Sequence, residues 1–148
     1  MSYLKKLLFF IILIYSSIVL AQGKNYYEQF NLELKKKAIE YKNEINFKKA
    51  QTFYLSKDWD STLVYSMKQL NTNQKILADY CHFLRGYCFA KKELYNQAEK
   101  ELNQVSKKFI FHPLVNHNFG FIALKAEKYQ KAIDYYQKTD SALIHNKI

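Results

Sequence analysis

The sequence has few of the residues that make turns. It contains one proline and three glycines in 148 residues. A protein of many strands needs a turn roughly every 8–12 residues, which glycine and proline most often supply. Hydrophobic residues make up 49% of the chain and aromatic residues 17%, which is ample for a core. The composition therefore predicts one folded, all-α domain and argues against a sheet protein or a disordered chain.

Arginine is also nearly absent. Arg85 is the only arginine among 23 basic residues, which outnumber 13 acidic ones and give a net charge of +10. Such a charge favours acidic proteins, anionic lipid or cell-surface polymers as partners. Arginine is the residue that most often reads base edges, so the composition argues against nucleic acid as a partner. The alternative is that the lysines only keep helix faces solvated.

The sequence lacks the motifs of common catalytic and metal sites. It has no glycine-rich phosphate loop, no HExxH, no CxxC and no serine in a recognisable nucleophile turn. Cys81 and Cys88 lie seven residues apart in one predicted helix, about 10 Å and too far for a disulfide. Cys81 and His82 are neighbours that point about 100° apart, and His112 and His117 lack the i, i+4 spacing of a zinc pair. We expect no enzyme activity, no metal and no cofactor.

The first 21 residues have the pattern of an export signal. Two lysines precede the apolar run Leu7–Tyr15, and Val19 and Ala21 precede an expected cleavage before Gln22. An uncleaved membrane anchor is the alternative, although a spanning helix needs about 20 apolar residues. Removing two lysines leaves 21 basic and 13 acidic residues, a net charge of +8. We expect a periplasmic or secreted protein with no stable membrane span after cleavage.

The chain contains an internal repeat. At an offset of 34 residues, two segments share four matched positions: Gly86 and Gly120, Tyr95 and Tyr129, Ala98 and Ala132, Leu102 and Tyr136. A third segment matches the first of these at an offset of 36, through Ala50, Phe53, Trp59, Thr62 and Ser66. The two extra residues are expected in the loop around LNTNQK. A fixed period of this length is typical of stacked structural repeats.

With these positions, the chain resembles the tetratricopeptide repeat (TPR) family in three degenerate copies near residues 43–78, 79–112 and 113–146. Where that family has a large aromatic residue, this chain has Asn46, His82 and Asn116. The resemblance implies antiparallel helix pairs stacked into an α-solenoid. Apolar residues at helical spacing in 22–42 predict an N-terminal capping helix, with a degenerate repeat fragment as the alternative: Tyr27, Phe30, Leu34, Ala38 and Tyr41.

The resemblance also implies a peptide-binding concave face on the first helix of each pair. Carrying the groove positions over gives Phe47, Gln51, Tyr54 and Leu55, then Tyr80, Phe83, Tyr87 and Lys91, then His117, Phe121, Leu124 and Lys125. The aromatic residues offer contact area and the lysines suit an acidic peptide. The alternative is that several of these aromatic side chains pack between neighbouring helices.

These observations predict a non-catalytic protein- or peptide-binding scaffold that acts outside the cytoplasm. The alternative is the truncated sensory front end of a larger bacterial envelope signalling protein. The last helix carries Ala142, Leu143, Ile144 and Ile148 with no further helix to cover them. Because solenoids need polar end caps, self-association through this helix is a further expectation.

The two matched glycines need a reason, because glycine costs about 1 kcal/mol against alanine inside a helix. Gly86 and Gly120 occupy the same place in the first helix of their copies. We expect the second helix of each pair to cross closest at that place, where a side chain would hold the helices apart. Ala50 is the equivalent small residue of the first copy.

Overall fold

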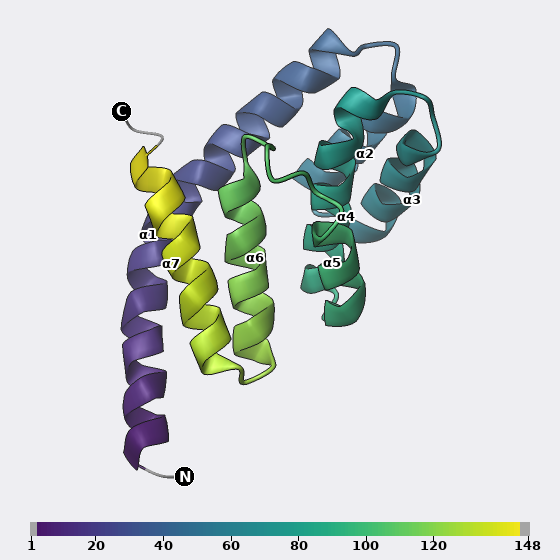
Figure 1. The fold of residues 1–148 in the computed structure, drawn as a ribbon. Helices are drawn as coiled ribbons and strands as arrows, with labels where there is room; N and C mark the ends of the chain where they lie inside the picture. Colours follow the sequence, from purple (N-terminus) through teal and green to yellow (C-terminus); the bar gives the residue numbers. More distant parts are fainter. Residues whose placement is uncertain (1–2, 146–148) are drawn as a thin grey trace. The chain divides into compact units, whose positions relative to one another are not determined.

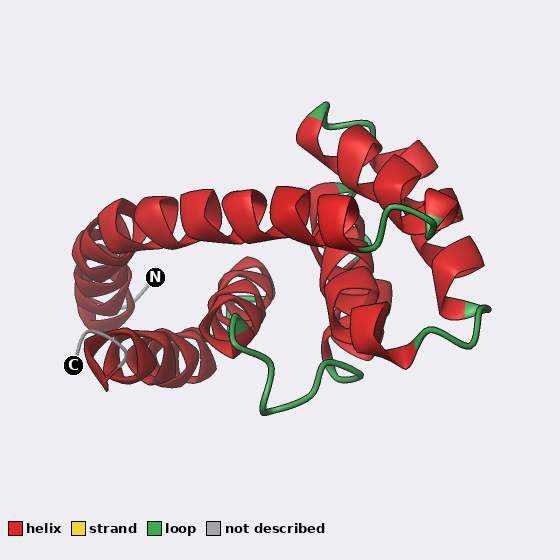
Figure 2. Ribbon diagram, turned by 90° about the horizontal axis from the view of Figure 1, so that it is seen from above, coloured by secondary structure: helices red, strands yellow, loops and turns green. Residues whose placement is uncertain are grey.

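A computed structural model describes residues 3–145, and the side chains of residue 4, residues 15–23 and residues 141–145 lie outside the description. The described residues form helices and no strand (Figures 1 and 2). The elements are α1 (Tyr3–Glu40), α2 (Ile45–Leu55), α3 (Trp59–Leu70), the 3₁₀ helix η1 (Lys75–Leu77), α4 (Ala78–Lys91), α5 (Tyr95–Leu102), α6 (His112–Lys125) and α7 (Tyr129–His145). The predicted all-α class is therefore confirmed.

The chain divides into two compact units. One contains Gln29–His112, which covers the second half of α1 and the helices from α2 to α5. The other contains Met1–Glu28 and Pro113–Ile148, which covers the first half of α1 with α6 and α7. We call them the central unit and the terminal unit.

The helices pack in consecutive pairs, as predicted. In the central unit α2 packs on α3 and α4 packs on α5, and α3 also packs on α4. In the terminal unit α6 packs on α7, where the rings of Phe119 and Tyr135 stack with centroids 5.2 Å apart. Each pair falls within one predicted copy of the repeat.

The two helices of each pair are joined by the same type of turn. The residue in its middle has a left-handed backbone, with φ of 62° at Lys57, 61° at Glu93 and 57° at Glu127. In every turn the following N–H donates to the carbonyl five residues back at 2.9 Å. The middle residue's own N–H donates to the carbonyl three residues back at 3.0–3.1 Å. These are the two bonds of a Schellman motif, which ends the first helix and starts the second within three residues.

Small residues mark the closest approach within a pair. A Cβ atom on Gly86 would lie 2.6 Å from side-chain atoms of Leu102, and one on Gly120 would lie 2.7 Å from the ring of Tyr136. Ala50, at the equivalent place in α2, is fully buried. The Gly86–Leu102 and Gly120–Tyr136 contacts occupy the same positions in two copies of the repeat. The close approach of the two helices at these positions explains why each first helix contains a glycine.

The segment expected to cap the array belongs to a longer helix. Both the export-signal pattern and the segment 22–42 lie largely within α1, which is continuous from Tyr3 to Glu40. Phe30, Leu34 and Ala38 are buried along one face, as the spacing predicts, while Lys35 and Lys36 are exposed.

Two expectations concern side chains that lie outside the described residues. These are the cleavage positions Val19, Ala21 and Gln22, and the uncovered C-terminal residues Ala142, Leu143, Ile144 and Ile148. In the described part of the chain, we find no helix with the length and apolarity needed to cross a membrane.

Replacing Gly86 by alanine should lower the free energy of unfolding by about 1–3 kcal/mol, although alanine favours helix by about 1 kcal/mol. The cause is the contact with Leu102, which is 1% exposed and has little room to move. Chemical denaturation measures the change. In a Leu102→Ala background the same substitution should be neutral or stabilising. Stabilisation in both backgrounds would contradict close approach at this position.

Replacing Glu93 by glycine should stabilise the protein by about 0.5–1 kcal/mol relative to Glu93→Ala. Glycine adopts the positive φ of 61° at this turn without a steric penalty, whereas alanine keeps the penalty of an L residue. Both variants remove the same exposed charge, so the difference in unfolding free energy isolates the backbone effect. If alanine proves as stable as glycine, the left-handed turn is wrong.

Candidate functional site

Four predicted groove residues form one aromatic surface in the central unit. Phe47 and Tyr54 come from α2, and Tyr80 and Phe83 come from α4; all four are buried. Phe47 contacts Tyr80 edge-on, with ring centroids 6.1 Å apart. We call these four residues the aromatic face.

Phe30 of α1 lies against this aromatic face and is fully buried. Its ring centroid is 4.7 Å from that of Phe83, 6.1 Å from Tyr54 and 6.3 Å from Tyr80. Phe111, from the α5–α6 connection, lies 5.2 Å away. Most of these pairs meet edge to face, the geometry that aromatic rings favour. One side chain of α1 thus joins α2, α4 and a connecting segment.

In the first two copies, these predicted groove residues therefore pack between the chain's own helices, which is the alternative given for them from the sequence. Burial raises the pKa of Tyr80 to about 12, and the nearby charge of Glu33 on α1 adds to the effect. Gln51, another predicted groove residue, is also buried, and Leu55 is half-buried. Sequence reasoning identified the aromatic residues and the apolar face of α1 but did not pair them.

In the second and third copies, a predicted lysine lies over the ring of a predicted aromatic residue. The ammonium of Lys91 lies 5.2 Å from the ring centre of Tyr87, and that of Lys125 lies 5.6 Å from the ring centre of Phe121. Both lysines are exposed and both rings are half-buried. Tyr87 also contacts the edge of the aromatic face through Tyr54, at 5.4 Å between centroids, and burial raises its pKa.

The predicted residues of the third copy lie in the terminal unit. The half-buried ring of His117 contacts Tyr27 of α1 at 5.8 Å and Tyr136 of α7 at 5.6 Å. The neighbouring Asn118 donates a hydrogen bond of 2.8 Å to the hydroxyl of Tyr27. Leu124 packs against the core of this pair. In this unit too, α1 contacts the first helix of the pair.

A charged cluster that sequence reasoning missed joins α4 to α5. Arg85 Nε donates to Glu101 Oε1 at 2.7 Å, and Nη1 donates to the Leu63 carbonyl at 2.7 Å. Glu101 Oε2 lies 2.8 Å from His82 Nδ1. Burial by itself raises the pKa of Glu101, but the hydrogen bonds from His82 and Arg85 outweigh it and hold the pKa below its ordinary value. The repeat offered a signal for this cluster, because Glu101 stands where the other two copies have tyrosine, at Tyr65 and Tyr135.

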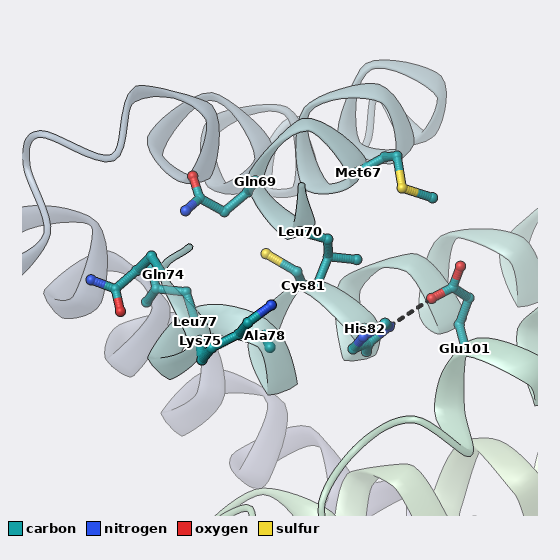
Figure 3. A pocket seen from close by; sticks show the side chains of 10 residues that line it. All are labelled: Met67, Gln69, Leu70, Gln74, Lys75, Leu77, Ala78, Cys81, His82 and Glu101. Carbon is teal, nitrogen blue, oxygen red and sulfur yellow. Dashed lines mark hydrogen bonds and ion pairs between the residues drawn. The ribbon is translucent and has the colours of Figure 1, made fainter. Parts of the chain in front are cut away.

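A pocket of about 300 Å³ lies next to this cluster (Figure 3). It is lined by Met67, Gln69 and Leu70 of α3, Gln74, Lys75 and Leu77 near η1, Ala78, Cys81 and His82 of α4, and Glu101 of α5. All ten residues belong to the central unit. In Figure 3 the His82–Glu101 pair stands at one end of the pocket, and Leu70 and Cys81 lie in the middle.

The cysteines show no sign of activation. Both are free thiols and both are buried. Burial raises the pKa of each to about 12, against the opposing effect of the Arg85 charge on Cys81 and of a hydrogen bond with Thr62 and the Arg85 charge on Cys88. A thiol must ionise to act as a nucleophile, so neither is suited to that role at neutral pH. Among the described side chains, no group of three or more histidines, cysteines and acids is placed to hold a metal ion.

Comparison with protein-family models, with curated proteins and with solved structures finds no match to this chain.

Replacing Glu101 by glutamine should destabilise the protein by about 1–3 kcal/mol at pH 7, because the buried Arg85 loses its charged partner. A carboxylate with a lowered pKa stabilises the fold above its ordinary value of 4.5, and that contribution is lost as the pH falls through the folded-state pKa. The wild type should therefore lose more stability below pH 4.5 than the variant, measured by denaturation at several pH values.

The matched control is Glu28→Gln, which removes an exposed carboxylate of α1. It should leave the acid dependence close to that of the wild type. If the Glu101 variant loses stability on acidification as steeply as the wild type, Glu101 is not held ionised by its partners.

Proposed function

We propose that this chain is a non-catalytic, exported TPR-like module that binds a peptide or protein segment in helical form. Its proposed partner contacts the first helices of the two pairs in the central unit, α2 and α4, and its proposed place of action is the periplasm or the cell exterior. No cofactor takes part in this function.

The first support comes from the equivalence of the pairs. Three helix pairs repeat the same Schellman turn, and two of them repeat the same close contact at a glycine, at intervals that match the sequence repeat. Repeats of this kind present similar surfaces from successive helices, which suits them to binding extended chains or helices. The repeated architecture does not by itself specify the ligand.

The observation that carries the proposal is Phe30 on the aromatic face. An amphipathic helix binds a groove through apolar anchors spaced three, four and seven residues apart. In α1, Phe30, Leu34 and Ala38 follow one another at steps of four residues, which keeps them on one side of the helix, and they are 0%, 0% and 6% exposed. The face therefore has the shape and chemistry to receive a helix with one aromatic anchor, and α1 occupies it within the same chain.

The exposed lysines favour a partner with acidic residues. Lys91 and Lys125 are exposed beside aromatic rings, so an acidic side chain of a partner helix could pair with either ammonium. The chain's net charge of +10 acts in the same direction at longer range.

The export proposal is supported by the start of α1. Lys5 and Lys6 are exposed, and the apolar run after them leaves several large side chains exposed, including Phe10 at 63% and Ile14 at 62%. A positively charged start followed by an apolar run is the signature of a secretory signal.

A synthetic peptide with the sequence of residues 24–42 tests the groove. Phe30→Ala in the full chain should weaken the internal contact, since truncating a buried Phe costs about 3–5 kcal/mol. The fluorescent peptide should then bind this variant at least tenfold more tightly than the wild type, measured by anisotropy. Circular dichroism establishes that the variant remains helical.

Leu32→Ala is the matched control, because Leu32 lies on the same helix and is 66% exposed. It should bind the peptide as weakly as the wild type. A second peptide with alanine in place of Phe30 should not bind any of the three proteins. Equal binding to all three proteins, or no binding to the Phe30 variant, would refute the groove.

A further inference from the structure

The pocket next to the Arg85–Glu101 cluster lies where the repeat is irregular. The first copy is two residues longer than the second. The extra residues lie between Ser66 of the first copy and Gly86 of the second. In this interval the structure has a short connection followed by η1 (Lys75–Leu77). Three of the pocket's lining residues come from this segment: Gln74, Lys75 and Leu77. This connection therefore forms one wall of the pocket.

The corresponding connection after α5 has the opposite chemistry. It buries Val105, Phe109 and Phe111, which fill the space beside α4 and α1. The ring centroid of Phe109 lies 5.0 Å from that of Tyr80. The connection after α3 instead reads NTNQK from 71 to 75 and leaves the space open.

The lining is apolar with a few polar groups at its edge, which is the usual character of a small-molecule site. Leu70, Leu77 and Cys81 supply apolar surface, and the exposed Met67 extends it outwards. A volume of about 300 Å³ is at the lower end of the range for ligand pockets, so the site suits a small molecule.

The charge in the pocket is positive. Glu101 is neutralised by Arg85 and held by His82, so it offers little repulsion to an anion. Lys75 forms no ion pair with any described carboxylate, and in Figure 3 its side chain extends across the pocket. Gln74 uses its Oε1 to accept a hydrogen bond of 3.3 Å from the Ile76 N–H.

We propose that this pocket binds a small monocarboxylate with a short apolar body. The carboxylate pairs with the Lys75 ammonium, while the apolar body lies against Leu70, Leu77 and Cys81. The site is separate from the aromatic face, and the proposal does not depend on peptide binding. Gln69 takes no part, because its amide is fully engaged with Phe47, Glu44 and Thr72.

Hexanoate is the probe, and 1-hexanol is its neutral counterpart. In ¹H–¹⁵N spectra of the full chain, hexanoate should shift the amide signals of residues 67–82 and saturate with a Kd of about 1 mM, typical of so small a ligand. Hexanol should bind at least tenfold more weakly. Lys75→Met, which keeps the aliphatic stem and removes the charge, should weaken hexanoate binding at least tenfold.

Lys108→Met is the control, since Lys108 is an exposed lysine of the corresponding connection after α5. It should leave hexanoate binding unchanged. Loss of binding in both lysine variants, or signal shifts spread over the whole surface, would reduce the effect to general attraction by a positive protein and overturn the proposal. Equal binding of hexanol and hexanoate, or no shift in residues 67–82, would also overturn it.

Discussion

The packing of the central unit depends on the burial of one side chain, Phe30. Its ring contacts aromatic residues from α2, α4 and the α5–α6 connection, and it comes from a fourth segment, α1. Burying a phenylalanine fully stabilises a fold by about 1.5–3 kcal/mol, and truncating it costs more because a cavity remains. Elements distant in the sequence are thus joined through one ring, while the contacts within each helix pair stay local.

Local rules account for the pairs themselves. A left-handed residue closes each turn, and a small residue, Ala50, Gly86 or Gly120, lets the two helices approach. The first copy has alanine where the others have glycine, and its buried partner position holds the small Ser66 in place of Leu102 and Tyr136. In the first pair, the extra methyl group of Ala50 is therefore accompanied by a much smaller residue at the partner position.

Much of the fold could be predicted from the sequence because these rules act over short distances. The period placed the three pairs, and the 3- and 4-residue spacing identified Phe30, Leu34 and Ala38 as one face of a helix. The sequence did not indicate what that face would contact, since an apolar stripe fits many aromatic surfaces equally well. The packing of α1 on the aromatic face is a tertiary contact, and hydrophobic periodicity does not predict which surfaces will pack together.

The two candidate sites differ in how far they could be foreseen. The aromatic face followed from the resemblance to the TPR family, but the resemblance did not imply that the face would be filled from within the chain. The Arg85–Glu101–His82 cluster and the pocket beside it arise where this chain departs from its own repeat. A position that breaks the repeat pattern can be recognised in the sequence, but the contacts made there depend on the surrounding fold.

The most direct test of the central claim is a nuclear Overhauser spectrum of the aromatic side chains. The ring of Phe30 should show cross-peaks to the rings of Phe83 and Phe111, whose centroids lie 4.7 Å and 5.2 Å away. Cross-peaks to both rings would place the second half of α1 on the aromatic face. A Phe30 ring without any cross-peak to Phe83 or Phe111 would contradict the account.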